Sequence, residues 1–209
     1  MTPGLRSAVS LLTVVLALPC RAEPVTAESL LEEMVDRAAL AEFSEPAYRT
    51  MQASSYDRRS TDPSDASDEG WFANADAGHF IRVEERAGRR EHVLMEADGP
   101  GAVVRIWSAN PAGTLRVYLD GADEPLIEED MAALLGGTGS VPEPFAGVRS
   151  RGYNLYLPIP FAESCKVTSD AGGFYYHVNW RRYDDGADVR SLDAWPPSEE
   201  TLAVAGAAL

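Results

Sequence analysis

The sequence predicts an all-β protein, a β-sandwich of the jelly-roll type preceded by one short helix. Segments in which apolar and polar residues alternate recur along the chain, and clusters of glycine and proline separate them. No helical patterns come between these segments, as they would in a parallel sheet with crossover helices. The chain has 209 residues, 45% of them hydrophobic, which is enough for a packed core. Many short strands without alternating helices favour a two-layered sandwich.

The first 22 residues are typical of a secretory signal peptide. Arg6 supplies a positive charge, and residues 8–18 form an apolar run too short to span a membrane. The segment ends at residues 20–22 with a small residue, Ala22, at the expected cleavage site. We expect cleavage after Ala22 and a secreted or periplasmic mature protein. Cys20 would suggest a lipoprotein, but Pro19 stands before it where a lipidation signal has a small residue.

The mature chain is strongly acidic and has a single thiol. The signal segment contains two arginines and no acidic residue, so its removal takes the formal net charge from −15 to −17. This charge argues against nucleic acid and anionic membranes as partners, and favours a neutral or cationic ligand. Cys165 has no other cysteine to pair with, so packing must hold the fold. His79, His92 and His177 lack metal-ligand spacing, and we expect no metal and no other cofactor.

Residues 23–52 form the predicted N-terminal helical segment. Thr26 or Ser29 can cap a helix there, and acidic residues in its first turns complement the helix dipole. The apolar residues recur with the helical period and lie at Leu30, Leu31, Met34, Val35, Ala38 and Ala41. The helix should end before Pro46.

Residues 54–79 lack any period and are rich in serine, aspartate and glycine, which predicts a long loop. The middle, 60–69, is interpreted as a solvated acidic excursion, because its acids have no apolar neighbour to pack against. The two ends, 55–58 and 71–76, mix aromatic side chains with hydrogen-bonding groups of the kind found in sugar sites. We therefore expect the functional residues of this loop at its ends.

Residues 98–121 carry the clearest β pattern and are interpreted as a hairpin. Two alternating runs flank a turn at residues 110–113, and a Gly-Pro-Gly sequence precedes the first run. Trp107 and Tyr118 would then pair across the two strands on one sheet face, as core residues, and a stacking platform is the less favoured alternative.

Five further segments are predicted strands, and the remainder is harder to assign. The strands cover residues 80–84, 92–97, 153–157, 164–169 and 174–183. Between 124 and 149 the strand signal is weak, and residues 134–137 suggest a brief helical turn followed by a loop. We place the sandwich domain at 53–190, followed by a truncated tail or the start of a second domain at 191–209.

Short motifs in a fixed order give the chain a family resemblance. They are LLEEMVDRAAL, SSYDR with a later NAD, DGPG, RIW, VYLDG, YNLYLPIPF and YYHVNWRRY. In this combination the chain resembles the N-terminal part of glycoside hydrolase family 172, long catalogued as a domain of unknown function. The resemblance runs from about residue 28 to about residue 190, which is most of the mature chain. No single motif is specific, but their common order and compatible spacing are.

The resemblance implies two successive jelly rolls, assembly into trimers or multiples of trimers, and hydrolysis of α-D-fructofuranosides or α-D-arabinofuranosides with retention of configuration. Retention requires two carboxylates roughly 5 Å apart, one as nucleophile and one as acid/base. In the family both are glutamates of the second jelly roll, in a GEGD-like and a GTGTEDY-like stretch, and neither stretch occurs in residues 1–209. We therefore expect the N-terminal jelly-roll portion of an exported furanoside hydrolase, truncated and inactive alone. The alternative is a non-catalytic carbohydrate-binding or assembly module.

Other acidic and nucleophilic residues are poor replacements for these glutamates. Glu84 and Glu85 point to opposite faces of one strand, and residues 128–130 should lie in a loop, so all are interpreted as surface charge. Cys165 lies in a predicted strand, with its neighbour Lys166 on the other face, and is interpreted as a small core residue. Hydrolysis through such residues is a third hypothesis.

The resemblance also implies sugar-contacting residues at the two ends of the long loop. Five positions match the early polar motif of the family: Ser55, Asp57, Arg58, Asn74 and Asp76. Two interpretations stay open, because these residues could shape a sugar pocket or could hold the loop through ion pairs and Asx turns. An acidic insertion separates the two ends here, where the family has a short glycine-rich link.

Overall fold

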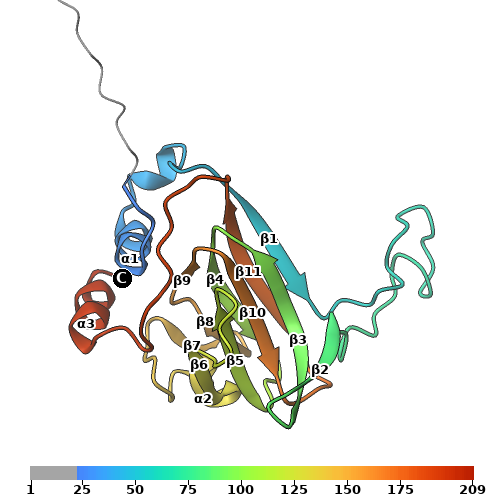
Figure 1. The fold of residues 1–209 in the computed structure, drawn as a ribbon. Coiled ribbons are helices and arrows are strands. Elements are labelled where there is room, and N and C mark those ends of the chain that lie inside the picture. The colour runs from blue at the N-terminus through green and yellow to red at the C-terminus, as the bar shows by residue number, and fades with distance from the viewer. Residues whose placement is uncertain (1–22) are drawn as a thin grey trace, which may run out of the picture.

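Two antiparallel sheets packed against each other form the body of the protein (Figure 1). The computed structural model describes residues 23–209, so the predicted signal peptide lies outside the described residues. The core lies between the sheets and takes side chains from both, such as Ile106 from one and Val167 from the other. The predicted all-β sandwich is confirmed.

The first sheet is built around two long central strands, β4 (Gly101–Ser108) and β11 (Tyr176–Tyr183), which pair antiparallel. Strand β1 (Tyr48–Ser54) pairs with the other side of β11 and forms one edge of the sheet. Two short strands share the remaining side of β4 and a third forms the far edge: β8 (Gly152–Leu155), β9 (Ile159–Phe161) and β7 (Ala146–Arg149).

The second sheet has the strand order β2-β3-β10-β5-β6. Its strands are β2 (Arg82–Arg86), β3 (Arg89–Asp98), β10 (Ser164–Ser169), β5 (Thr114–Leu119) and β6 (Ile127–Asp130). Strand β10 lies at the centre, where Cys165 is fully enclosed in the core and burial raises the pKa of its thiol. The interpretation of Cys165 as a core residue is confirmed.

The predicted hairpin of residues 98–121 is wrong. Strands β4 and β5 form as expected, but they belong to different sheets, and residues 109–113 carry the chain from one sheet to the other. The connection is held by distant segments: Asn110 Oδ1 accepts from the Tyr175 N–H at 3.0 Å, and the Thr114 N–H donates to Asp170 Oδ1 at 2.8 Å. A period of two residues identifies a strand but does not identify its partner.

Four strands had no clear signal in the sequence: β1, β6, β7 and β9. Residues 128–130, predicted to lie in a loop, belong to β6, and this prediction is wrong. These strands are short or lie at sheet edges, where few alternating apolar residues are needed. The brief helical turn is confirmed as α2 (Met131–Gly136), and Gly137 ends it in the left-handed conformation with a φ of 77°.

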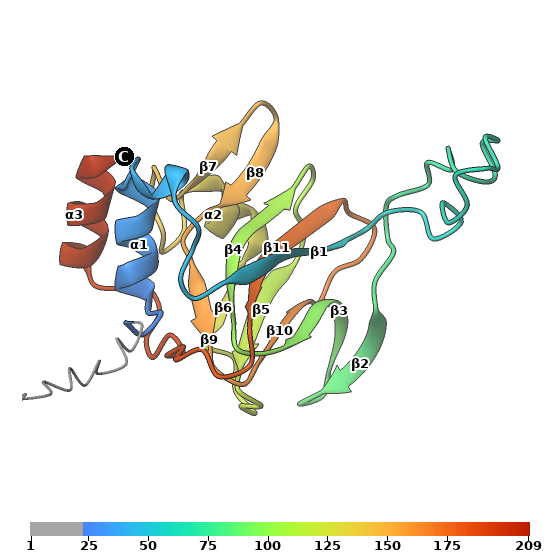
Figure 2. The same ribbon diagram turned by 90° about the horizontal axis from the view of Figure 1, so that it is seen from above.

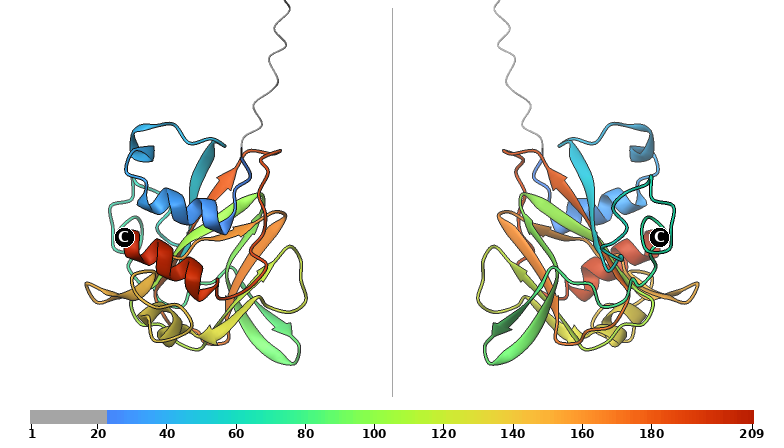
Figure 3. Two further views of the ribbon diagram at one scale, coloured as in Figure 1. Left: turned by 90° about the vertical axis from the view of Figure 1, so that its left-hand side faces the viewer. Right: turned by 90° about the vertical axis from the view of Figure 1, so that its right-hand side faces the viewer.

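Two helices lie side by side at one end of the sandwich (Figures 2 and 3). Helix α1 (Ala27–Val35) begins at Thr26, whose side chain forms a capping box with Ser29. It ends earlier than predicted, and a separate turn of 3₁₀ helix follows at Ala39–Ala41. Helix α3 (Glu199–Ala208) occupies the tail that showed no clear period. Within residues 23–209 no helix is long and apolar enough to cross a membrane.

Helix α1 covers one end of the outward face of the first sheet. Leu30 from the helix packs with Ala102 of β4 and Tyr183 of β11 in a small second apolar cluster. The rest of that outward face is left free of helices (Figure 2). The predicted long loop is also confirmed, since no helix or strand occurs between residues 55 and 81.

Candidate functional site

The free part of the outward face of the first sheet carries a cluster of polar and aromatic side chains. Side chains alternate along a strand, so residues on either side of a core residue point outward. Ile106 of β4 and Val178 of β11 belong to the core and pair with each other. Their neighbours therefore form an outward cluster, here called the platform: Arg105, Trp107, Asn154, His177 and Asn179.

The platform residues are placed in register by the strands that bear them. Trp107 lies opposite His177 on β11 and opposite Asn154 on β8. The Trp107 and His177 ring centroids are 4.8 Å apart, with the rings tilted by 39°. Asn154 Oδ1 accepts from Arg105 Nη2 at 3.1 Å and from the Tyr156 hydroxyl at 3.0 Å. An aromatic pair thus lies beside a hydrogen-bonded cation, amide and hydroxyl.

A glycine lets the Trp107 ring lie against the neighbouring strand. A β-carbon at Gly152 of β8 would overlap Nε1 of the Trp107 indole. Trp107 is partly exposed on this outward face, while Tyr118 is buried on the other sheet. The prediction that the two form a cross-strand core pair is therefore wrong.

His177 is neutral at pH 7 and has its ring next to charged neighbours. Burial lowers its pKa below the ordinary value, the Arg105 guanidinium lowers it further, and the Asp76 carboxylate opposes both. A neutral imidazole offers one donor and one acceptor. Ser54, from which the long loop departs, lies opposite His177 in the β1–β11 ladder, so the root of the loop adjoins the platform.

The platform contains an unused hydrogen-bonding atom. Asn179 Nδ2 donates to Gln52 Oε1 of β1 at 3.0 Å. Asn179 Oδ1, in contrast, is the one buried side-chain oxygen or nitrogen among the described residues that has no hydrogen-bond partner. A buried acceptor without a partner is unfavourable, and a ligand donor would relieve the cost.

The first predicted site residue, Ser55, is buried at the root of the long loop. Its backbone N–H donates to the Tyr176 carbonyl at 3.2 Å, and its hydroxyl accepts from the Tyr176 N–H at 3.1 Å. These bonds continue the β1–β11 pairing by one residue. Ser55 therefore fixes where the loop leaves the sheet.

Asp57 and Asp76 join the two ends of the long loop. The Asp57 N–H donates to Asp76 Oδ1 at 2.8 Å. The Asp57 carboxylate accepts from the Arg59 side chain at 2.7 Å and from the Ala75 N–H at 3.0 Å. Hydrogen bonds from the Arg59 side chain and backbone hold the pKa of Asp57 well below its usual range. The carboxylate is therefore ionised and fully engaged within the loop.

Arg58 and Asn74 lie outside this network. Arg58 donates from Nη1 to the Tyr56 carbonyl at 2.9 Å and from Nη2 to the Ser54 carbonyl at 3.0 Å, and its guanidinium lies 3.9 Å from the Tyr56 ring centroid. Asn74 is exposed. The structure thus brings Ser55, Asp57 and Asp76 together at the loop root, with Arg58 beside them and Asn74 apart.

Sequence reasoning favoured a core position for Trp107 over a stacking platform and did not find the other platform residues, although a signal was present. In both RIW and YYHVNW, the polar or aromatic residues recur two positions apart and so share one strand face. Arg105 and Trp107 form one such pair, and His177 and Asn179 form the other. The mistaken hairpin hid this pattern because it assigned Trp107 to the core.

The platform suits a neutral ligand rich in hydroxyl groups, but its residues do not form an acid/base pair. Among the described residues the buried carboxylates are Asp57 and Glu91, and each is bound by an arginine. The described part of the chain also contains no group of three His, Cys, Asp or Glu side chains that could hold a metal ion. The arrangement can bind and orient a polar ligand.

A family model described as the GH172 first beta-sandwich domain matches residues 46–199, which span both sheets, the long loop and the platform. No curated protein matches the chain.

Proposed function

Because the chain belongs to glycoside hydrolase family 172, we propose that it is the sugar-contacting first sandwich of an exported furanoside hydrolase. Its ligand is an α-D-arabinofuranoside or an α-D-fructofuranoside. The observation that carries this proposal is the outward Trp107–His177 pair, which lies beside the hydrogen-bonded Arg105 and Asn154. An exported enzyme of this kind assembles as a trimer or a multiple of one.

The chemistry of the platform supports a neutral sugar as ligand. A partly exposed indole can cover the apolar face of a sugar ring, and neutral His177 can donate to or accept from a hydroxyl group. Asn179 Oδ1 is available as an acceptor. The net charge of −15 gives no attraction for an anionic ligand.

In this proposal the chain binds and orients the sugar, and it does not hydrolyse the substrate by itself. Retaining hydrolysis needs two carboxylates roughly 5 Å apart across the scissile bond. Asp57 accepts four hydrogen bonds within the loop, and Glu91 lies on the other sheet, bound by Arg89, Tyr118 and Thr168. Neither is free to act as nucleophile or acid. The catalytic pair belongs to a second jelly roll.

Calorimetric titration with an α-arabinofuranosyl oligosaccharide and with a fructofuranosyl oligosaccharide tests the binding. One of the two sugars should release or absorb heat with the wild-type chain and much less with Trp107→Ala. Glu85→Ala, an exposed change on the second sheet, is the matched control and should bind like the wild type. No heat at millimolar sugar would contradict the proposal.

Hydrolysis is tested separately with p-nitrophenyl α-D-arabinofuranoside. The purified chain should release no p-nitrophenol above the rate in buffer. Release that survives Trp107→Ala but is lost in a glutamate variant of this chain would show that its own acids are catalytic. That result would contradict the proposal that this chain binds the sugar and a second jelly roll hydrolyses it.

A further inference from the structure

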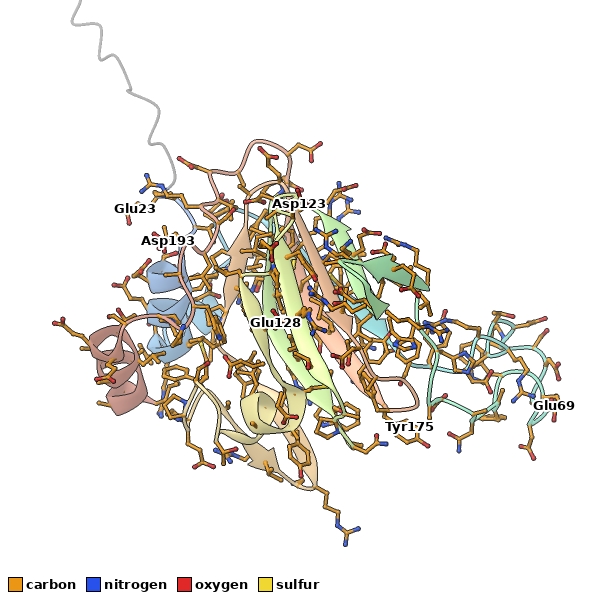
Figure 4. All side chains as sticks on the ribbon, turned by 60° about the horizontal axis from the view of Figure 1, so that its bottom comes forward. Glu23, Glu69, Asp123, Glu128, Tyr175 and Asp193 are labelled. Atoms are coloured by element: carbon orange, nitrogen blue, oxygen red, sulfur yellow. The ribbon has the colours of Figure 1, made fainter. Side chains whose placement is uncertain are left out.

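Residues 60–72 form an arm that stands away from the sandwich (Figures 1 and 2). Its hydrogen bonds join it to itself and to the adjoining loop residues: the Ser60 hydroxyl donates to the Trp71 carbonyl, and the Trp71 N–H donates to the Asp65 carbonyl at 2.7 Å. Glu69, which Figure 4 places at the far end, pairs with Arg59. The arm is thus a structured projection that makes no hydrogen bond to either sheet of the described chain.

The arm combines four acidic residues with two exposed aromatic side chains. The acids are Asp62, Asp65, Asp68 and Glu69, and the arm contains no lysine or arginine. Trp71 is 43% exposed and Phe72 is 60% exposed. Adjacent exposed aromatic side chains on a projecting loop are typical of contact sites rather than of solvated turns.

A surface with the complementary properties lies at the start of β1. Arg49 and Arg182 lie directly opposite each other in the β1–β11 ladder, and both are exposed. Neither side chain makes an ion pair or a hydrogen bond within residues 23–209. Like charges placed directly opposite each other across two strands destabilise a sheet. A carboxylate brought between the two guanidinium groups would relieve this repulsion.

Apolar surface adjoins this arginine pair. Met51, two residues along β1 and on the same face as Arg49, is 40% exposed and lies opposite Trp180. Arg49, Met51 and Arg182 line a hollow of about 450 Å³ together with Tyr183, Asp184 and Asp185. The strand β1 is also the edge of the sheet, so no further strand covers it.

We propose that the arm of one copy of this chain docks on the Arg49–Arg182 surface of a second copy. The arm brings carboxylates to the two guanidinium groups, and Trp71 or Phe72 packs against Met51. The arm cannot reach this surface in its own chain, because Arg49 lies near the start of β1, whereas the arm follows the end of β1 and projects away from the sandwich (Figure 2). The contact joins two different surfaces, so it is head-to-tail and closes into a ring or extends as a chain.

Analytical ultracentrifugation of matched variants tests the proposal. The wild type should associate, and association should weaken as salt is added, because the contact is between charges. R49E/R182E and D62R/D68R should each sediment as monomers. An equal mixture of these two variants should form heterodimers, because the unchanged arm of R49E/R182E then meets the unchanged arginine pair of D62R/D68R.

The control is R37E/R190E, which changes the net charge as much as R49E/R182E does, at exposed arginines away from the surface. It should associate like the wild type, and circular dichroism should show all variants folded. A monomeric wild type, unchanged association of R49E/R182E, or a mixture that stays monomeric would each overturn the proposal. None of these results depends on sugar binding by the platform.

Discussion

The outward faces of the two sheets are both polar, but they use their polar side chains in opposite ways. On the second sheet the charged groups satisfy one another. Glu91 is 0% exposed and accepts from Arg89 Nε at 2.7 Å, from the Tyr118 hydroxyl at 2.9 Å and from the Thr168 hydroxyl at 2.7 Å. On the first sheet the platform keeps a partly exposed indole, a neutral histidine and an unpaired amide oxygen.

Ion pairs extend the Glu91 network across the second sheet. Lys166 of β10 pairs with Glu84 of β2 at 3.0 Å, and Arg116 of β5 pairs with Glu128 of β6 at 2.8 Å. When the donors and acceptors of a face already bond to one another, few of them remain to bind a ligand. Polarity on a sheet face therefore indicates binding only where hydrogen-bonding capacity remains unused.

The largest expected effect is the loss of the buried Glu91 carboxylate. In Glu91→Ala, Arg89, Tyr118 and Thr168 lose their common acceptor, and breaking such a buried charged network costs about 3 kcal/mol of unfolding free energy. Urea unfolding measures the loss. Glu85→Ala is the control, since Glu85 is exposed on the same sheet, and its unfolding midpoint should not change. Equal midpoints for the two variants would contradict the network.

Two variants, one on each outward face, should separate sugar binding from stability. Trp107→Ala should weaken sugar binding roughly tenfold, which corresponds to about 1.4 kcal/mol, because the platform loses its aromatic surface. Tyr118→Phe removes the hydroxyl that donates to Glu91 and accepts from Arg89 Nη2, and it should lower stability by about 1.5 kcal/mol without changing sugar binding. Calorimetry and urea unfolding on both proteins check this. Loss of sugar binding in Tyr118→Phe would indicate that the ligand binds the second sheet, which would contradict the proposal.

Acid should weaken the second-sheet network. Burial raises the pKa of Glu91, but hydrogen bonds from Thr168, Arg89 and Tyr118 outweigh it, and the folded-state pKa lies below the ordinary value of 4.5. The unfolded chain therefore takes up the proton first, and stability is lost as the pH falls from about 4.5 through the folded pKa. The unfolding free energy of Glu91→Gln, measured between pH 6 and pH 3, should fall less steeply than that of the wild type. Parallel curves would contradict this.

The smallest expected effect concerns His177 on the platform. Its folded-state pKa lies below 6.5, so the unfolded chain binds the proton more tightly and stability falls as the pH falls below about 6.5. His177→Gln removes this contribution. Between pH 7 and pH 5 the variant should lose slightly less unfolding free energy than the wild type. A steeper loss in the variant would mean that the charged imidazole is stabilised.

Residues with local patterns were predictable from the sequence, and distant pairings were not. The cap at Thr26, the helical turn ended by Gly137 and the core position of Cys165 each follow from neighbouring residues. The partner of β4 did not follow, because β11 lies about seventy residues further along the chain, and alternation is the same for every partner.

The candidate site shows the same limit. The motif at residues 55–58 was visible, but its role in tying the loop ends depends on Asp76 and Tyr176, which only the folded chain brings near. Trp107 and His177 are seventy residues apart in sequence, and their contact arises from the β4–β11 register. The residues that share such a face cannot be predicted from the sequence of a single strand.

Chemical-shift mapping of the ¹⁵N-labelled chain with an α-arabinofuranosyl or fructofuranosyl oligosaccharide tests the central claim, that the first-sheet face contacts the sugar. The signals of the Trp107 indole N–H and of the Asn154 and Asn179 side-chain amides should shift in a saturable way, and those of residues around Glu91 and Tyr118 should not. Shifts confined to the second sheet, or none with either sugar, would contradict it.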